Sequence, residues 1–200
     1  MKALPAIAIA ATFVLVSPAV EAAKVKVQGR TMVERLDLSS PQAAAGTFLD
    51  AYAGSDYFAA YFALSLDARL GFSNAVSSFN LNAVIPGAKA TDMPGSLVWD
   101  SARQTDMLSQ EILAEPALGF DDLMQAAERN GMLPFAIGVA EIGAPTSLAD
   151  GALTLPVQNP GGKPEALDVH VIIMPDGRWR VDRITWEGSD AQARPWGLLR

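Results

Sequence analysis

The chain has 200 residues, half of them hydrophobic, with 22 acidic and 15 basic side chains and a formal net charge of -7. A surplus of negative charge repels nucleic-acid phosphates and anionic lipid headgroups, so the composition argues against nucleic acid as a partner. Cysteine is absent, which excludes disulfide bonds, thiolate catalysis and thiolate metal sites.

The first 22 residues have the pattern of a signal peptide. Lys2 supplies a positive charge, residues 3–16 are uncharged and apolar, and small side chains at Val20 and Ala22 predict a cut after Ala22. The apolar run has roughly 14 residues, whereas a helix needs about 20 to cross a bilayer. The sequence therefore predicts a periplasmic or secreted protein with no stable membrane insertion.

A flexible arm is predicted over residues 23–39, and a helical hairpin follows it. Ser40 fits an N-cap and Pro41 fits the first helical position, and apolar residues then recur at helical spacing until Gly54 ends the helix. Asp56 is placed to cap a second helix, whose apolar positions are Phe58, Tyr61, Phe62 and Leu66. The short link between the two helices makes them neighbours.

The middle of the chain is predicted to be mainly helical. A helix is expected over residues 67–79, a loop over residues 80–96, and another helix from Asp100 or Ser101 to the residues before Pro116. A further helix is predicted from a helical spacing that Gly131 closes. Its apolar positions are Phe120, Leu123, Met124 and Ala127.

After that helix the apolar period changes from about 3.6 to 2, which is typical of strands. Segments rich in proline and glycine separate four runs of strand composition. The predicted strands are Phe135–Ile142, Leu153–Val157, Leu167–Met174 and Trp179–Trp186. Their short connections favour an antiparallel meander.

The segment from Met174 to Arg178 predicts a tight hairpin turn, with Gly177 in the left-handed conformation. Residue 174 then faces 178, and the ladder pairs 173 with 179, 171 with 181 and 170 with 182. The face predicted to be buried holds Val169, Val171, Ile173, Trp179 and Val181. The opposite face, with a solvated charged stripe, holds His170, Ile172, Met174, Arg178, Arg180 and Asp182. A change of apolar parity before Ile184 and Trp186 predicts a bulge that bends the last strand.

Three segments together resemble the NTF2-like (SnoaL-like) superfamily. They are the Ser40-Pro41 helix with Phe48-Leu49-Asp50-Ala51-Tyr52, the helix start Asp56-Tyr57-Phe58-Ala59-Ala60, and the ending Gly177-Arg178-Trp179-Arg180-Val181-Asp182-Arg183-Ile184. The resemblance covers about residues 40–66 and 135–187. It implies one α+β domain over residues 40–190, followed by a tail over 191–200. In that domain N-terminal helices pack on a curved antiparallel sheet to form a cone, often with a pocket and often dimeric through the sheet. The superfamily includes enzymes and non-catalytic binding modules, so the fold does not decide the function.

His170 and Asp182 are the catalytic candidates because the predicted register sets them opposite each other. A histidine with a carboxylate partner can act as a general base near neutral pH. The competing interpretation is an exposed cross-strand ion pair, which contributes about 0.2 to 1 kcal/mol. Arg178 and Arg180 on the same face favour that second interpretation.

Several polar groups near the helices are further candidates for a functional role. The carboxylates and phenols of this region fit caps and core positions better than catalysis; they are Asp50, Tyr52, Asp56, Tyr57 and Tyr61. Four arginines either present a cation to an acidic ligand inside the cone or lie on polar helix and strand faces: Arg69, Arg103, Arg129 and Arg183. No metal ligand set, nucleophile motif or cofactor motif is found.

Aromatic and aliphatic side chains of the helices and the last strand are the candidates to line a ligand pocket, or else to fill the core. They are Phe48, Tyr52, Tyr61, Phe62, Trp179 and Val181. The favoured hypothesis is an exported, non-catalytic module that binds a small apolar or amphipathic ligand or docks to an envelope protein. One alternative is an isomerase, dehydratase or cyclase of the SnoaL-like kind with His170 and Asp182 as its base pair. Another is a structural homodimer formed through the His170, Ile172 and Met174 face.

Overall fold

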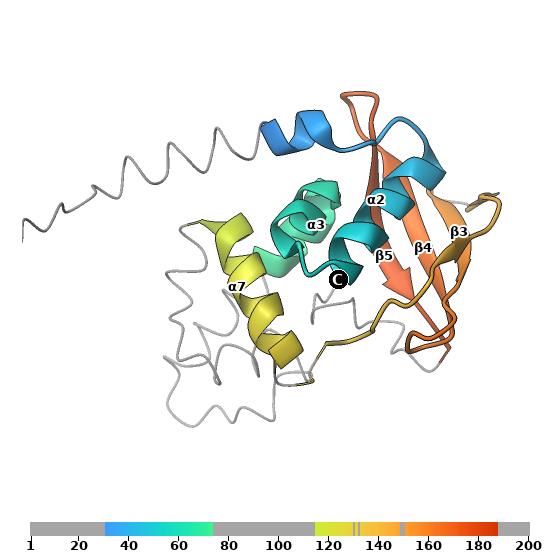
Figure 1. Ribbon diagram of the computed structural model, residues 1–200. Coiled ribbons are helices and arrows are strands. Elements are labelled where there is room, and N and C mark those ends of the chain that lie inside the picture. The colour runs from blue at the N-terminus through green and yellow to red at the C-terminus, as the bar shows by residue number, and fades with distance from the viewer. Residues whose placement is uncertain (1–30, 74–114, 130, 132, 149–150, 188–200) are drawn as a thin grey trace, which may run out of the picture.

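The computed structural model describes residues 31–73, 115–129, 131, 133–148 and 151–187. The predicted α+β class is confirmed, since helices precede and pack on a curved five-stranded antiparallel sheet. The helices are α2 (Pro41–Ala53), α3 (Tyr57–Ala63) and α7 (Pro116–Arg129), with a further helix over residues 66–73. The strands are β1 (Glu141–Ile142), β2 (Thr146–Ser147), β3 (Leu153–Gln158), β4 (Ala166–Ile173) and β5 (Trp179–Thr185). Figure 1 shows α2 across one face of the sheet, α3 beside α2, and α7 beyond α3. The signal peptide, the loop over 80–96, the helix predicted from Asp100 or Ser101, and the tail lie outside the described residues.

The predicted helical hairpin is confirmed at its local signals. The Ser40 side chain accepts a hydrogen bond from the Ala43 amide at 3.1 Å, Pro41 is the first helical residue, and Gly54 ends α2. The Asp56 side chain caps α3. The second helix is shorter than predicted, because residue 64 turns into extended backbone and pairs with β5.

The helix closed by Gly131 is also confirmed, as α7, and Gly131 has the positive φ of 65° that lets the backbone leave the helix. The predicted helix over 67–79 begins one residue earlier, at residue 66, and is described as far as residue 73. Near the N-terminus, residues 31–35 are helical and the Leu38 carbonyl accepts a hydrogen bond from the Trp179 amide at 2.9 Å. The described end of the predicted arm therefore lies against the last hairpin.

The sheet has the strand order β1-β3-β4-β5, and β2 pairs with β3. The meander of the last three strands is confirmed, but the strand predicted over Phe135–Ile142 is reduced to its last two residues. Around Gly138 the chain contacts the β3–β4 connection instead, because the Gly138 amide donates to Asn159 Oδ1 at 2.8 Å. A Cβ at Gly138 would lie 2.2 Å from the Pro160 carbonyl oxygen, so this close approach requires glycine.

The β4–β5 turn forms as predicted. Gly177 has φ +76°, the Met174 amide donates to the Arg178 carbonyl at 2.9 Å, and Ile173 pairs with Trp179. The bulge is present, but it lies at Asp182, which has no partner in the ladder: Val171 pairs with Val181, and His170 pairs with Arg183. The predicted pairing of residue 170 with 182 is therefore wrong.

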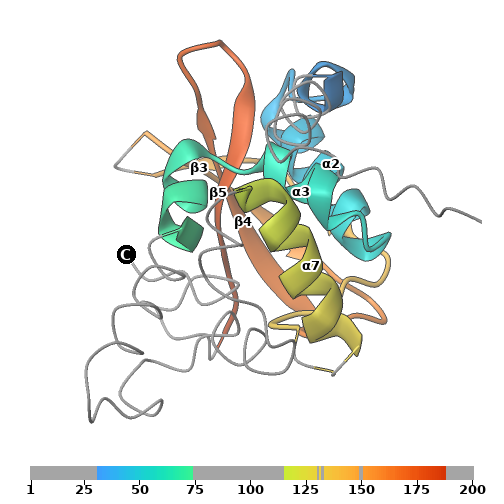
Figure 2. The ribbon, with the colours of Figure 1, turned by 90° about the vertical axis from the view of Figure 1, so that its left-hand side faces the viewer.

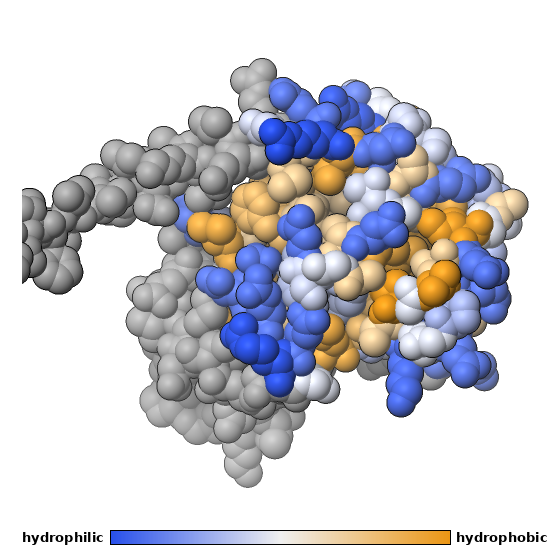
Figure 3. All heavy atoms as spheres, viewed as in Figure 1, coloured by the Kyte–Doolittle hydropathy of each residue, from blue (hydrophilic) through white to orange (hydrophobic). Residues whose placement is uncertain are grey.

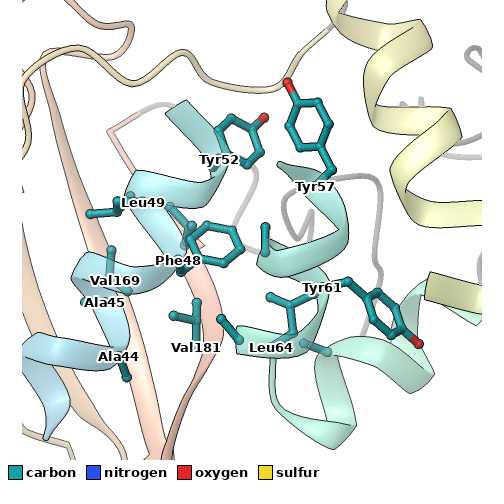
Figure 4. Close-up of a cluster of buried hydrophobic side chains, with 14 of the residues drawn as sticks. Ala44, Ala45, Phe48, Leu49, Tyr52, Tyr57, Tyr61, Leu64, Val169 and Val181 are labelled. Atoms are coloured by element: carbon teal, nitrogen blue, oxygen red, sulfur yellow. The ribbon is translucent and has the colours of Figure 1, made fainter. Parts of the chain in front are cut away.

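The core lies between α2, α3, α7 and the concave face of the sheet. Figure 4 shows side chains of α2, α3 and Leu64 meeting Val169 and Val181 from the two strands. The predicted buried face holds for Val169, Val171 and Val181, which are fully buried. Ile173 is 56% exposed, contrary to prediction, because the turn of the hairpin extends past α2 and α3 (Figure 2).

Candidate functional site: a pocket beside the last hairpin

A pocket of about 340 Å³, open to solvent, lies between the chain that follows α3 and the β4–β5 turn. Four of its lining side chains are apolar and three are charged. The lining residues are Leu64, Leu66, Arg69, Met174, Pro175, Asp176 and Arg180. Two segments far apart in sequence thus form its walls.

Ser65 fixes the position of these two segments relative to each other. Its amide donates to the Val181 carbonyl at 2.7 Å, and its hydroxyl donates to Asp182 Oδ1 at 2.7 Å. The same hydroxyl oxygen accepts from the Ala68 amide at 3.0 Å, so Ser65 also caps the helix over 66–73. These bonds attach that helix to the bulge in β5.

Arg69 places a half-buried cation in the pocket wall. Its Nε donates to the Tyr61 carbonyl at 3.1 Å and its Nη2 donates to the Phe62 carbonyl at 2.7 Å, which satisfies the last turn of α3. The guanidinium also lies 5.2 Å and 5.3 Å from the ring centres of Tyr61 and Phe62. Burial lowers the pKa of Arg69; the nearby Tyr61 opposes this shift and the positive charge of Arg180 adds to it.

Arg180 provides the second cation, and its position corrects the predicted solvated stripe. Arg180 is only 5% exposed; Leu64 pairs with Val181 beside it, and Leu66 and Arg69 line the same pocket. Its Nη2 lies 3.3 Å from Asp176 Oδ2, and its Nη1 donates to the Trp179 carbonyl at 2.9 Å. Burial lowers the pKa of Arg180, and Asp176 counteracts that shift.

The catalytic candidates do not come together as predicted. His170 alternates along β4 with the buried Val169 and Val171, so it lies on the face of the sheet turned away from α2. Its two ring nitrogens lie 3.1 Å and 2.9 Å from the hydroxyls of Thr154 and Thr185. Asp182 instead accepts from Ser65 and lies 3.4 Å from Arg183 Nε. The geometry thus gives His170 cross-strand hydroxyl contacts in place of the general-base pairing.

The six pocket candidates lie in the core or against it. Phe48, Tyr52, Tyr61 and Val181 are core residues, and Phe62 and Trp179 are partly buried against them. Tyr52 stacks on Phe135 with 4.3 Å between the ring centres, and Tyr61 packs against Phe120 at 5.5 Å. None of the six lines the pocket described above.

The predicted group of carboxylates and phenols is joined by two acidic residues of α7. Tyr57 Oη donates to Glu128 Oε2 at 3.1 Å, and Ser55 Oγ donates to Glu128 Oε1 at 2.8 Å. Asp121 accepts from the Phe58 amide at 3.2 Å. Burial and the neighbouring Glu128 raise the pKa of Tyr57, and burial raises the pKa of Asp121. These bonds hold α7 against the start of α3.

Sequence reasoning named one of the two pocket arginines. Arg69 was a candidate cation and lines the pocket, whereas Arg129 is exposed at the end of α7 and Arg183 lies beside Asp182. Arg103 lies outside the described residues. Arg180 was missed because its alternation along the strand predicts a solvent face, and the segment that lies beside it in the structure, from Leu64 to Arg69, is more than a hundred residues earlier in the chain.

Comparison with protein-family models, curated proteins and solved structures finds no match to this chain. Among the described residues, no three histidine or acidic side chains are grouped so as to hold a metal ion. No helix formed by the described residues is both long enough and apolar enough to span a membrane. Figure 3, which has the same view as Figure 1, shows hydrophilic and apolar residues interspersed on this face.

Proposed function

We propose that this chain is an exported, non-catalytic binding module of the NTF2-like kind, which takes a small amphipathic molecule in the pocket beside its last hairpin. The observation that supports this proposal is the pocket itself, in which apolar side chains, the buried Arg180 and the half-buried Arg69 surround one solvent-accessible space. Its volume of about 340 Å³ is within the range of small-molecule sites, about 300 to 1,000 Å³. The export of the protein rests on the signal-peptide pattern of residues 1–22.

The core supports a role in which the pocket, rather than the interior of the cone, receives the ligand. Phe48, Leu49 and Tyr57 are each at most 1% exposed, and their aromatic and aliphatic neighbours fill the space between the helices and the sheet. Each such side chain stabilises the fold by about 1.5 to 3 kcal/mol when it is buried. A ligand in that space would have to displace them.

The test uses the exported chain, purified as the cell processes it. Its thermal unfolding is measured with a panel of fatty acids, fatty alcohols, sterols and aromatic acids. A ligand at 100 times its Kd stabilises the folded state by about 2.7 kcal/mol, which corresponds to roughly 5 to 10 °C in Tm for a chain of this size. No stabilisation by any member of the panel would refute the proposal. Cell fractionation and N-terminal sequencing test the export, with a mature chain beginning at Ala23 as the expected result.

A further inference from the structure

We propose that the ligand of this pocket is a small monoanion with an apolar body, of the short- to medium-chain fatty carboxylate class, whose carboxylate lies against Arg69 and Arg180. This inference rests on the proposed function and names the chemistry of its ligand.

The charges of the pocket favour a single negative charge. Arg69 and Arg180 contribute two positive charges and Asp176 contributes one negative charge, which gives the described residues of the lining a net charge of +1. Asp176 is bonded to Arg180, and no carboxylate among the described residues forms an ion pair with Arg69. One monocarboxylate neutralises this surplus.

The hydrogen bonds of the two guanidiniums leave donors for such an anion. Each guanidinium has five N–H groups. Arg69 donates to two carbonyl oxygens, and Arg180 donates to one carbonyl and to Asp176. Carbonyl groups carry no formal charge, so within the described part of the chain no carboxylate compensates the charge of Arg69, which is half-buried. A charge that is partly removed from water and has no counter-ion is unfavourable, and a carboxylate that enters the pocket relieves that cost.

The remaining walls require an apolar body. Leu64, Leu66, Met174 and Pro175 surround the same space as the arginines, and Leu66 is 55% exposed. An inorganic anion gains nothing from these surfaces, whereas an alkyl chain gains about 25 cal/mol for each Å² that it removes from water. A small volume suits a short chain.

The test compares octanoate with octanol by isothermal titration of the full exported chain. The two molecules share an alkyl chain and differ in charge, so octanoate is expected to bind at least about tenfold more tightly, with an affinity that falls as salt concentration rises. Inorganic phosphate, which lacks the apolar body, is expected to bind more weakly than octanoate.

A change in the pocket charge gives a second readout. Asp176→Asn keeps an oxygen that can accept the Arg178 amide bond, which Asp176 Oδ1 accepts at 3.0 Å, and raises the net charge of the lining to +2. Octanoate affinity is expected to increase about threefold or more, with octanol affinity unchanged. Asp122→Asn is the matched control, since it makes the same change of total charge on an exposed residue of α7.

The outcomes separate the inference from the function on which it rests. Equal binding of octanoate and octanol, or equal effects of Asp176→Asn and Asp122→Asn on octanoate affinity, would overturn the inference and leave the binding module intact. Binding of phosphate as tight as that of octanoate would also overturn it. If neither octanoate nor octanol binds and the ligand panel gives no stabilisation, the proposed function fails as well.

Discussion

Ser65→Ala is the substitution that tests how the pocket is assembled. Ser65 is fully buried, and its hydroxyl both caps the helix over 66–73 and donates to Asp182 at 2.7 Å. Loss of a serine N-cap costs about 0.5 to 2 kcal/mol. Loss of a hydrogen bond to a charged partner adds about 1.5 to 3 kcal/mol. The expected decrease in the free energy of unfolding is therefore about 2 to 5 kcal/mol.

Ser40→Ala provides a matched control, because Ser40 caps α2 through the Ala43 amide and, among the described residues, its side chain bonds to no charged group. Its expected cost is the cap alone, about 0.5 to 2 kcal/mol. Urea unfolding followed by tryptophan fluorescence measures the decrease in the free energy of unfolding for each of the two variants. A difference of about 2 kcal/mol corresponds to roughly 1 M in the midpoint at a slope of about 2 kcal/mol per M.

An Asp182→Ala background isolates the bond between Ser65 and the bulge. In that background the cost of Ser65→Ala is expected to fall to the cost of Ser40→Ala, because only the cap remains to be lost. The reasoning is refuted if Ser65→Ala costs no more than Ser40→Ala in the original chain. It is also refuted if the Asp182→Ala background leaves the cost of Ser65→Ala unchanged.

Three further predictions follow from the geometry. Burial raises the pKa of all three tyrosines of the chain, so phenolate absorbance at 295 nm should appear at higher pH in the native protein than in urea. The neutral phenols therefore stabilise the folded state below pH about 10, and this stabilisation is lost as the pH rises above that value. Titration curves that coincide in buffer and in urea would contradict this prediction. Gly177→Ala should destabilise the protein by about 1 to 2 kcal/mol, because Gly177 has a φ of +76°. Gly46→Ala should stabilise it by about 0.4 to 1 kcal/mol, because Gly46 lies in α2 and a Cβ added there would come no closer than 3.6 Å to its nearest neighbour, Ile142 Cδ1. Equal effects of the two substitutions on thermal unfolding would be inconsistent with this account. His170→Ala should leave octanoate affinity within about twofold, since His170 lies four residues before Met174, which follows the end of β4, or about 13 Å along the strand direction. A tenfold loss of affinity by calorimetry would place the histidine in the site.

The parts of the fold that the sequence predicted depend on neighbours along the chain. The Ser40 cap, the proline that follows it and the Gly177 turn each act within a few residues, and each formed as expected. The alternation along β4 likewise identified Val169 and Val171 as buried. These signals act through backbone geometry that a short segment fixes by itself.

The parts that sequence reasoning missed depend on contacts between distant segments. The change in the alternation of apolar positions required a bulge before Ile184, but it did not show which residue would be the one left unpaired in the ladder. The residue that takes this place, Asp182, is the one to which Ser65 donates from 117 residues away. The same pairing of residues 64 and 65 with β5 shortens α3 and brings this segment beside Arg180. One non-local contact thus accounts for the bulge position, the shortened helix and the pocket.

Arg69 joins the stability of the fold to the chemistry proposed for the pocket. Its guanidinium is held by the Tyr61 and Phe62 carbonyls and by both rings of those residues, so its position does not depend on a bound ligand. A side chain that is already held in place loses little conformational entropy when an anion binds, so less of the binding free energy is spent on ordering it and the affinity is higher. Arg180, by contrast, already has a partner in Asp176, whose side chain is 51% exposed. Arg69 is therefore the cation that gains most from a ligand carboxylate, and Asp176 is the group that competes with that carboxylate for Arg180.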